Sequence, residues 1–366
     1  MNVEDGTRID EEARAQGISR EELLKRAAVA GLAIAGAGGL ARSATAAIDN
    51  SLPKRGGTLR LGVPGGSAKD IIDGQYIVTT PDIARLMTGW ETLVVNDAQF
   101  KLKFDGLASE ISANKAADQW TIRVRDGIEF HNGKTMGAAD VRYSLQRLIN
   151  PKVAIGGQAS LASVDPKRIK QLDKRTLRLF LKHRDGTILD AFTVYTNAIV
   201  PLGYGPKGAG TAKPNVGTGP YKVQSFSPGQ QSVHVRNPNY WRTGQPYFDK
   251  IVIIDFPDDT ARVNALLGGQ VEAITNLPAS QIAAVKGNPQ LRVLSSPTGG
   301  WQPFTMRVDK APFSDPRVRQ AMRLIIDRKQ MIQQALDGQG RVANDLYAPF
   351  DPCYARDLPQ RSQDLE

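Results

Sequence analysis

Two short motifs, which begin twenty residues apart, constrain the fold more than any other feature of this 366-residue chain. Residues 217–221 read Gly-Thr-Gly-Pro-Tyr, and residues 237–241 read Asn-Pro-Asn-Tyr-Trp. The glycines of the first motif permit a tight turn and Pro220 fixes its own φ, so we expect a strand directly after it. The alternating run 232–236 predicts a returning strand, and residues 227–229 (Ser-Pro-Gly) supply the turn between the two. The motifs therefore predict a β-hairpin with restrictive turns, and neither has the layout of a catalytic motif.

Further blocks accompany the hairpin in a fixed order along the chain. Residues 127–134 read Gly-Ile-Glu-Phe-His-Asn-Gly-Lys and run on into a helix-like stretch at 139–145. Another block lies downstream at residues 313–321, and Asp327 and Arg328 follow it. Together with the hairpin motifs, these blocks resemble the signature regions of the peptide/nickel-type solute-binding proteins, extracellular family 5, which serve ABC importers. A single block would be weak support, whereas four in the family's order are specific.

The resemblance implies an α/β fold of two lobes, like that of periplasmic binding proteins, with a discontinuous lobe I. Carried onto this chain, it assigns residues 56–77 and 196–300 to lobe I. It further assigns residues 78–195 to an inserted subdomain of lobe I and 301–366 to lobe II. Because family members normally continue and complete lobe II, we expect an incomplete lobe II and interpret the sequence as C-terminally truncated.

The hydrophobic periodicity independently predicts a mixed α/β protein, because strand-like and helix-like segments alternate. The expected strands are 58–63, 120–124, 175–181, 250–256 and 291–295, and the expected helices are 82–93, 138–148, 259–267 and 280–285.

The composition argues against nucleic-acid and metal chemistry. The net charge is +10, from 47 Lys/Arg against 37 Asp/Glu, but the cations are spread singly without a run, which predicts a solvated basic surface and no nucleic-acid partner. The single cysteine, Cys353, excludes disulfides within the chain and cysteine-based metal clusters. His131, His183 and His234 lie far apart in sequence, so we expect no metal and no cofactor.

The N-terminal residues 1–46 have the pattern of an export signal. Lys25 and Arg26 precede an apolar run at 27–40, which is too short to span a bilayer, and the small residues 44–46 follow as a cleavage site. Residues 19–25 resemble a degenerate twin-arginine box, with Glu21 in place of the second arginine. We therefore expect export to the periplasm or cell envelope; the alternative is a buried Ala/Gly helix of the folded domain.

Two places are candidate ligand sites. Gly65, Gly66 and Ser67 follow the first strand, where loops of α/β sheets face ligands. Trp301 and Gln302 follow two glycines at the expected crossing between lobes, where an indole offers an apolar wall.

Other conspicuous residues are expected to be structural. His131 has no nucleophile or carboxylate at motif spacing, so packing at a turn is favoured over a general-base role. Tyr240 and Trp241 are interpreted as anchors of the hairpin instead of a ligand-stacking pair. Asp315 and Arg319 are expected to form an ion pair or a helix cap.

The resemblance implies a monomeric, non-catalytic substrate-binding component of an ABC importer. It would capture a peptide or related small solute between its lobes and deliver it to a membrane permease. The alternatives are a secreted envelope hydrolase and a non-functional fragment of a binding protein. The resemblance leaves the solute open, because family members differ in cargo.

Overall fold

The computed structural model describes residues 53–98, 100–153, 159–205, 215–296, 299–344, 346 and 354–365. The expected signal peptide, residues 1–46, and Cys353 lie outside the described residues. Within the described part, no helix has the length and apolar character needed to cross a membrane.

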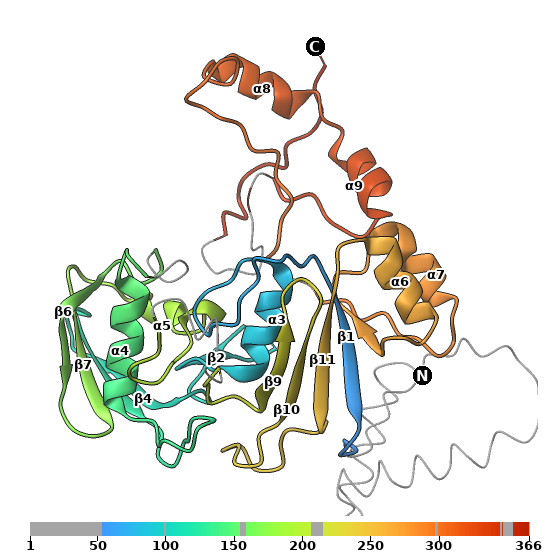
Figure 1. Cartoon of the computed structure of the whole chain (residues 1–366). Coiled ribbons are helices and arrows are strands. Elements are labelled where there is room, and N and C mark those ends of the chain that lie inside the picture. The colour runs from blue at the N-terminus through green and yellow to red at the C-terminus, as the bar shows by residue number, and fades with distance from the viewer. Residues whose placement is uncertain are drawn as a thin grey trace, which may run out of the picture. The chain divides into compact units, whose positions relative to one another are not determined.

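A mixed five-stranded sheet of order β12-β1-β11-β10-β9 carries the first candidate site (Figure 1). β1 pairs in parallel with β11 from Thr58↔Lys250 to Pro64↔Phe256, and with β12 on its other side. Parallel pairing brings the carboxyl ends of these strands to one edge. The antiparallel β9–β10 hairpin completes the sheet. The strands are β1 (Thr58–Pro64), β9 (Tyr221–Ser227), β10 (Gln231–Arg236), β11 (Lys250–Phe256) and β12 (Ala273–Ile274).

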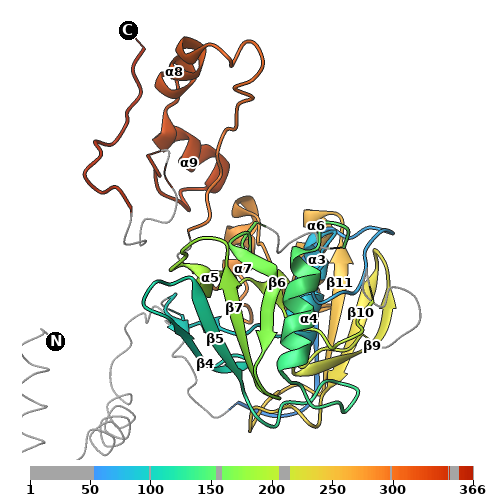
Figure 2. The same cartoon turned by 90° about the vertical axis from the view of Figure 1, so that its left-hand side faces the viewer.

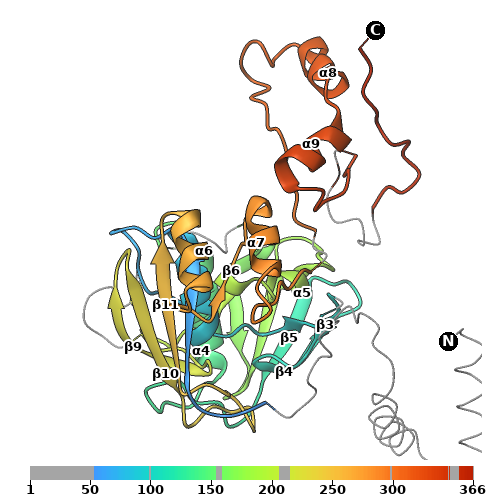
Figure 3. The ribbon, with the colours of Figure 1, turned by 90° about the vertical axis from the view of Figure 1, so that its right-hand side faces the viewer.

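Two helices pack on this sheet. α3 (Thr80–Gly89) contacts β1, β9 and β11, and begins with a capping box formed by Thr79 and Asp82. α6 (Asp259–Leu267) contacts β1, β11 and β12, and Figure 3 shows it beside β11. Its N-cap Asp258 accepts a hydrogen bond from the Ala261 amide at 2.7 Å. Local capping therefore sets where both helices start.

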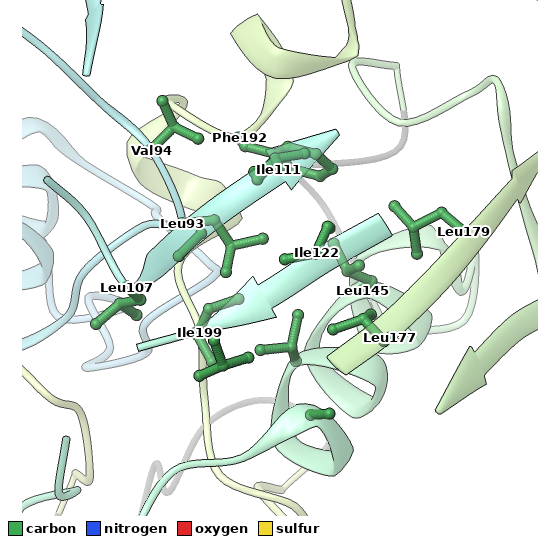
Figure 4. Close-up of a cluster of buried hydrophobic side chains, with 14 of the residues drawn as sticks. Leu93, Val94, Leu107, Ile111, Ile122, Leu145, Leu177, Leu179, Phe192 and Ile199 are labelled. Carbon is green, nitrogen blue, oxygen red and sulfur yellow. The ribbon is translucent and has the colours of Figure 1, made fainter. Parts of the chain in front are cut away.

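A second, antiparallel sheet of order β4-β5-β7-β6 packs against α4 (Ala138–Ile149), which lies beside β6 in Figure 2. Fully buried side chains alternate with less buried ones along β5 and β7, so one face of the sheet supplies the core. Figure 4 shows this core, which includes Ile122, Leu145 and Leu177. The strands are β4 (Ala108–Ala113), β5 (Gln119–Val124), β6 (Val164–Gln171) and β7 (Thr176–Leu181).

The remaining elements are short or lie late in the chain. They are β2 (Val95–Asn96), β3 (Leu102–Lys103), α5 (Ile188–Ala191), η1 (Tyr195–Asn197), η2 (Ala279–Gln281), α7 (Ile282–Lys286), α8 (Pro316–Leu324) and α9 (Arg328–Leu336).

The predicted elements are largely confirmed, including the hairpin and the helix at 259–267. The strand predicted at 291–295 is wrong: Leu291 and Val293 pack against the cluster under α6 without pairing to a strand. The helix predicted at 82–93 instead ends at Gly89. The division into lobes stays a prediction. α3, which that division places in the inserted subdomain, packs on the five-stranded sheet.

Candidate ligand-binding site

The loop after β1 is built for close packing at the carboxyl edge of the parallel strands. Gly65 and Gly66 have φ values of +96° and +113°, which residues with a side chain rarely adopt. The Gly65 amide donates to the Phe256 carbonyl at 2.7 Å, which ties the loop to the end of β11. A Cβ at Gly66 would lie 2.6 Å from the Cβ of Asp255, so only glycine fits. The structure thus places Gly65, Gly66 and Ser67 together at the sheet edge.

A buried arginine joins this loop to α3 and β11. The Arg85 guanidinium contacts Asp70 at 3.2 Å and Asp82 at 2.8 Å, and also pairs with Asp255. All four side chains are almost completely buried. Arg85 also donates to Ser232 Oγ at 3.2 Å. The cluster therefore links the segment after the loop, the helix and two strands.

Three aspartates face one guanidinium, so the cluster carries excess negative charge when all are ionised. Burial raises the pKa of Asp82, against the hydrogen bonds from the Val78 amide and Arg85. Burial likewise raises the pKa of Asp255, whose bond to Arg85 opposes the shift. Asp255 Oδ2 has no hydrogen-bond partner among the described residues, consistent with a carboxyl group that retains a proton more readily than an exposed one.

A serine–histidine pair extends the cluster but lacks the features of a catalytic pair. His234 Nε2 lies 2.9 Å from Ser232 Oγ, and its Nδ1 lies 3.1 Å from Thr88 Oγ1 instead of a carboxylate. Both Ser232 and His234 are fully buried, so a substrate cannot reach them. Burial and the nearby Arg85 lower the pKa of His234 to about 3, so the imidazole is neutral and a weak base.

Side chains from both motifs of the hairpin donate hydrogen bonds to one carboxylate, that of Glu91, which follows α3. Glu91 accepts hydrogen bonds from Thr218 Oγ1 at 2.9 Å, Tyr240 Oη at 2.8 Å and Trp241 Nε1 at 2.9 Å. Burial raises its pKa, although these three donors favour the charged form. Tyr240 and Trp241 therefore anchor the hairpin, as expected for structural residues.

The glycines of the first motif allow the same close approach. A Cβ at Gly217 would lie 1.9 Å from the Gly89 carbonyl oxygen. His131 seals the contact from the other side: its Nδ1 accepts from the Gly217 amide at 3.3 Å, and its Nε2 lies 2.9 Å from the Gly219 carbonyl oxygen. Burial lowers the pKa of His131, so the neutral ring is a structural clamp.

The hairpin reaches the candidate loop at its tip. Gly229 has a φ of +70°, and a Cβ there would lie 2.9 Å from the Ser67 carbonyl carbon. The turn of the hairpin therefore packs against the backbone of Ser67, a candidate ligand-binding residue.

Trp301 and Gln302 lie in an irregular stretch that follows residue 299, and Trp301 is 49% exposed. Their role as ligand contacts stays a prediction. Asp315 is confirmed as a helix cap, accepting from the Arg317 amide at 2.8 Å. The expected ion pair with Arg319 is wrong, because the Asp315 carboxylate pairs with Arg317 at 2.7 Å and Arg319 donates to the Phe313 carbonyl at 2.6 Å.

Sequence reasoning missed Arg85, Asp255 and Glu91. Arg85 and Asp255 are 170 residues apart in sequence, so no local spacing links them. A hint was available for Glu91, which is the one charged residue in the run Trp-Glu-Thr-Leu-Val-Val at 90–95, directly after α3. Among the described residues, no group of three or more His, Cys, Asp or Glu side chains is arranged to hold a metal ion.

Comparison with known proteins identifies the family to which this chain belongs. Residues 105–366 match the family described as bacterial extracellular solute-binding proteins, family 5 Middle, and the chain belongs to that family. The probable di/tripeptide-binding protein 5 of Pseudomonas aeruginosa is 26% identical over 321 residues, which cover 81% of this chain and 60% of the relative.

Two solved structures share the fold. AgaA from A. tumefaciens R10, in complex with agropinic acid, superposes with a TM-score of 0.65 at 27% identity, covering 78% of this chain and 57% of that one. AppA from Bacillus subtilis, in complex with a nonapeptide, gives a TM-score of 0.71 at 21% identity, covering 86% and 62%. The fold is that of the two-lobed periplasmic binding proteins, and the chain spans about three fifths of each of these relatives.

Proposed function

We propose that the protein is the substrate-binding component of an ABC importer, and that it captures a peptide or related small solute between two lobes. Membership of the solute-binding family over residues 105–366 is the observation that carries this proposal. Closure of the lobes would bury the solute and present a closed surface to a membrane permease. Export to the periplasm or envelope, and a monomeric state, belong to the same proposal.

The loop at residues 65–67 supports one wall of the site. Its two glycines bring backbone groups close to a ligand without side-chain obstruction, and the Arg85 cluster holds the following segment in place. Trp301 and Gln302 would supply part of the opposite wall. Peptide backbones offer both donors and acceptors, which suits a wall that combines half-buried main chain with an indole.

The three relatives are described as a di/tripeptide-binding protein and as proteins in complex with agropinic acid and with a nonapeptide. We propose a peptide or a related small solute for this chain.

A catalytic role has little support in the described residues. The buried Ser232–His234 pair is out of a substrate's reach, and His131 is bonded to backbone on both ring nitrogens. The non-enzymatic assignment rests otherwise on the family.

Isothermal titration calorimetry against separate pools of di- and tripeptides, opines and oligosaccharides tests the proposal. We expect saturable binding to the peptide or opine pool. Absence of binding to every pool, or hydrolysis of a labelled peptide by the purified protein, would overturn it.

A further inference from the structure

A large share of the net positive charge falls on the β6–β7 hairpin and the residues that directly follow it. Residues 164–184 contain eight Lys or Arg and two Asp, a net charge of +6 out of +10 for the whole chain. Leu177, Leu179 and Leu181 of β7 point into the core, so the alternate residues of this strand face outward.

Three cations and one aromatic share the outward side of the hairpin. Lys170 lies opposite Arg178 in the strand register, and Arg168 lies with its guanidinium carbon 4.4 Å from the centre of the Phe180 ring. The Lys170 ammonium lies 5.5 Å from the same ring. We call Arg168, Lys170, Arg178 and Phe180 the cationic face.

Within the described residues, no carboxylate forms an ion pair with the three cations of this face. Two acidic residues lie on the hairpin itself: Asp165 in β6, and Asp173 in the turn, where it accepts hydrogen bonds from the Arg175 and Thr176 amides. The positive charge is therefore available to an external anion.

Protection of a sheet edge explains only part of this pattern. β6 is an edge strand, and Pro166, Arg168 and Lys170 would discourage pairing with another chain. β7 is an interior strand, however, so Arg178 and Phe180 have no edge to protect.

We propose that the cationic face docks the protein on the anionic lipid headgroups of a membrane. A headgroup layer presents phosphates over a plane, which matches cations spread across two neighbouring strands. A half-buried aromatic between two long cations suits the boundary between headgroups and acyl chains. Sites for single-stranded nucleic acid usually carry several stacking aromatics, whereas the outward side of β5, β6 and β7 carries Phe180 alone.

This inference rests on the proposed function only for the choice of a membrane as the anionic surface. Docking of this kind would keep the solute-loaded protein near its permease by raising its local concentration at the membrane.

Co-sedimentation with lipid vesicles tests the inference. The full chain and the triple variant Arg168→Gln/Lys170→Gln/Arg178→Gln are compared on vesicles of phosphatidylglycerol and phosphatidylcholine, and on phosphatidylcholine alone, at low and high salt. Each cation near an anionic surface contributes about fivefold in partitioning, so we expect the triple variant to bind more than about tenfold more weakly. Binding of the full chain should disappear on neutral vesicles and weaken with salt.

The matched control is Lys54→Gln/Lys286→Gln/Arg292→Gln, which removes the same charge from exposed positions outside the second sheet. Its binding should fall by less than about threefold. Because Lys170 is exposed, Lys170→Gln alone provides a variant that keeps the fold, with a loss of about fivefold.

Equal losses in the two triple variants, or no binding of the full chain to anionic vesicles at low salt, would overturn the inference. So would tighter binding to a single-stranded oligonucleotide than to vesicles at matched phosphate concentration. Calorimetry with the peptide pool on the same proteins separates this outcome from failure of the proposed function, since solute binding requires no lipid.

Discussion

Residues 53–296 and residues 299–365 differ in how their apolar side chains are used. The first region contains four clusters of buried hydrophobic residues, and the last fully buried side chain among the described residues is Val285. In the second region, α8 and α9 form but neither buries a residue fully, and Phe304 is 66% exposed.

The difference separates interactions that are local in sequence from those that need another helix or sheet of the chain to pack against. Asp315 and Asp327 cap α8 and α9 from within the neighbouring turn, so these helices are specified by nearby residues. Burial instead requires other elements, which the two sheets supply only to the first region. We therefore expect substitutions to be costly in the first region and nearly neutral in the second.

Substitution of Arg85 and of Arg317 should give the largest difference in the free energy of unfolding between the two regions. Arg85→Met leaves three buried carboxylates without their counter-charge, so we expect a loss of about 3–5 kcal/mol in the free energy of unfolding. Arg317→Met removes an exposed ion pair and should change it by less than about 0.5 kcal/mol. Urea unfolding followed by circular dichroism measures both. Equal losses would contradict the comparison.

An identical substitution in the two regions isolates the effect of burial. Ile253 is fully buried in β11, and Ile253→Ala should cost about 2–5 kcal/mol of unfolding free energy. Ile325 is 51% exposed after α8, and Ile325→Ala should stay within about 0.5 kcal/mol. A loss above about 2 kcal/mol for Ile325→Ala, in the same urea titration, would mean that the second region has a core of its own.

The contribution of Glu91 should depend on pH. Glu91→Gln replaces an acceptor of three hydrogen bonds and should cost about 1–3 kcal/mol, against little change for the exposed control Glu110→Gln. Because burial raises the pKa of Glu91 in the folded state, its ionisation destabilises the fold as pH rises above the ordinary pKa of a glutamate side chain. The advantage of the native chain over Glu91→Gln should therefore shrink as pH increases. Unfolding curves at several pH values check the direction, and a growing advantage would show a lowered pKa instead.

The effect of Trp301→Ala on stability should be the smallest. Its side chain is 49% exposed, so the free energy of unfolding should change by less than about 0.5 kcal/mol. If the indole forms a wall of the ligand site, affinity for the bound solute should fall by about tenfold. Calorimetry on this variant checks both parts against the exposed-aromatic control Phe100→Ala, for which we expect no change in solute affinity.

The sequence predicted what local chemistry determines. The helix at 259–267 is predictable from its amphipathic pattern and from Gly268 and Gly269 after its end, and the structure adds the cap by Asp258 at its start. The hairpin was placed because Gly229 marks its turn. Long-range polar partners could not be predicted: Glu91 binds side chains 127, 149 and 150 residues away, and no periodicity connects them.

The grouping of charge also escaped the sequence. Lys170 and Arg178 are separated along the chain, and only the register of β6 and β7 brings them opposite each other. The loop at residues 65–67 is predictable because it follows a strand. The Arg85 cluster that holds it is not predictable, because its members are far apart in sequence.

Hydrogen exchange with mass spectrometry, with and without an equimolar pool of di- and tripeptides, tests the central claim of solute capture most directly. Without peptide, we expect slow exchange in β1 and β11 and fast exchange in α8 and α9. With peptide, exchange should slow at residues 65–67 and around Trp301. Peptide that binds but leaves exchange at both places unchanged would contradict capture at this site.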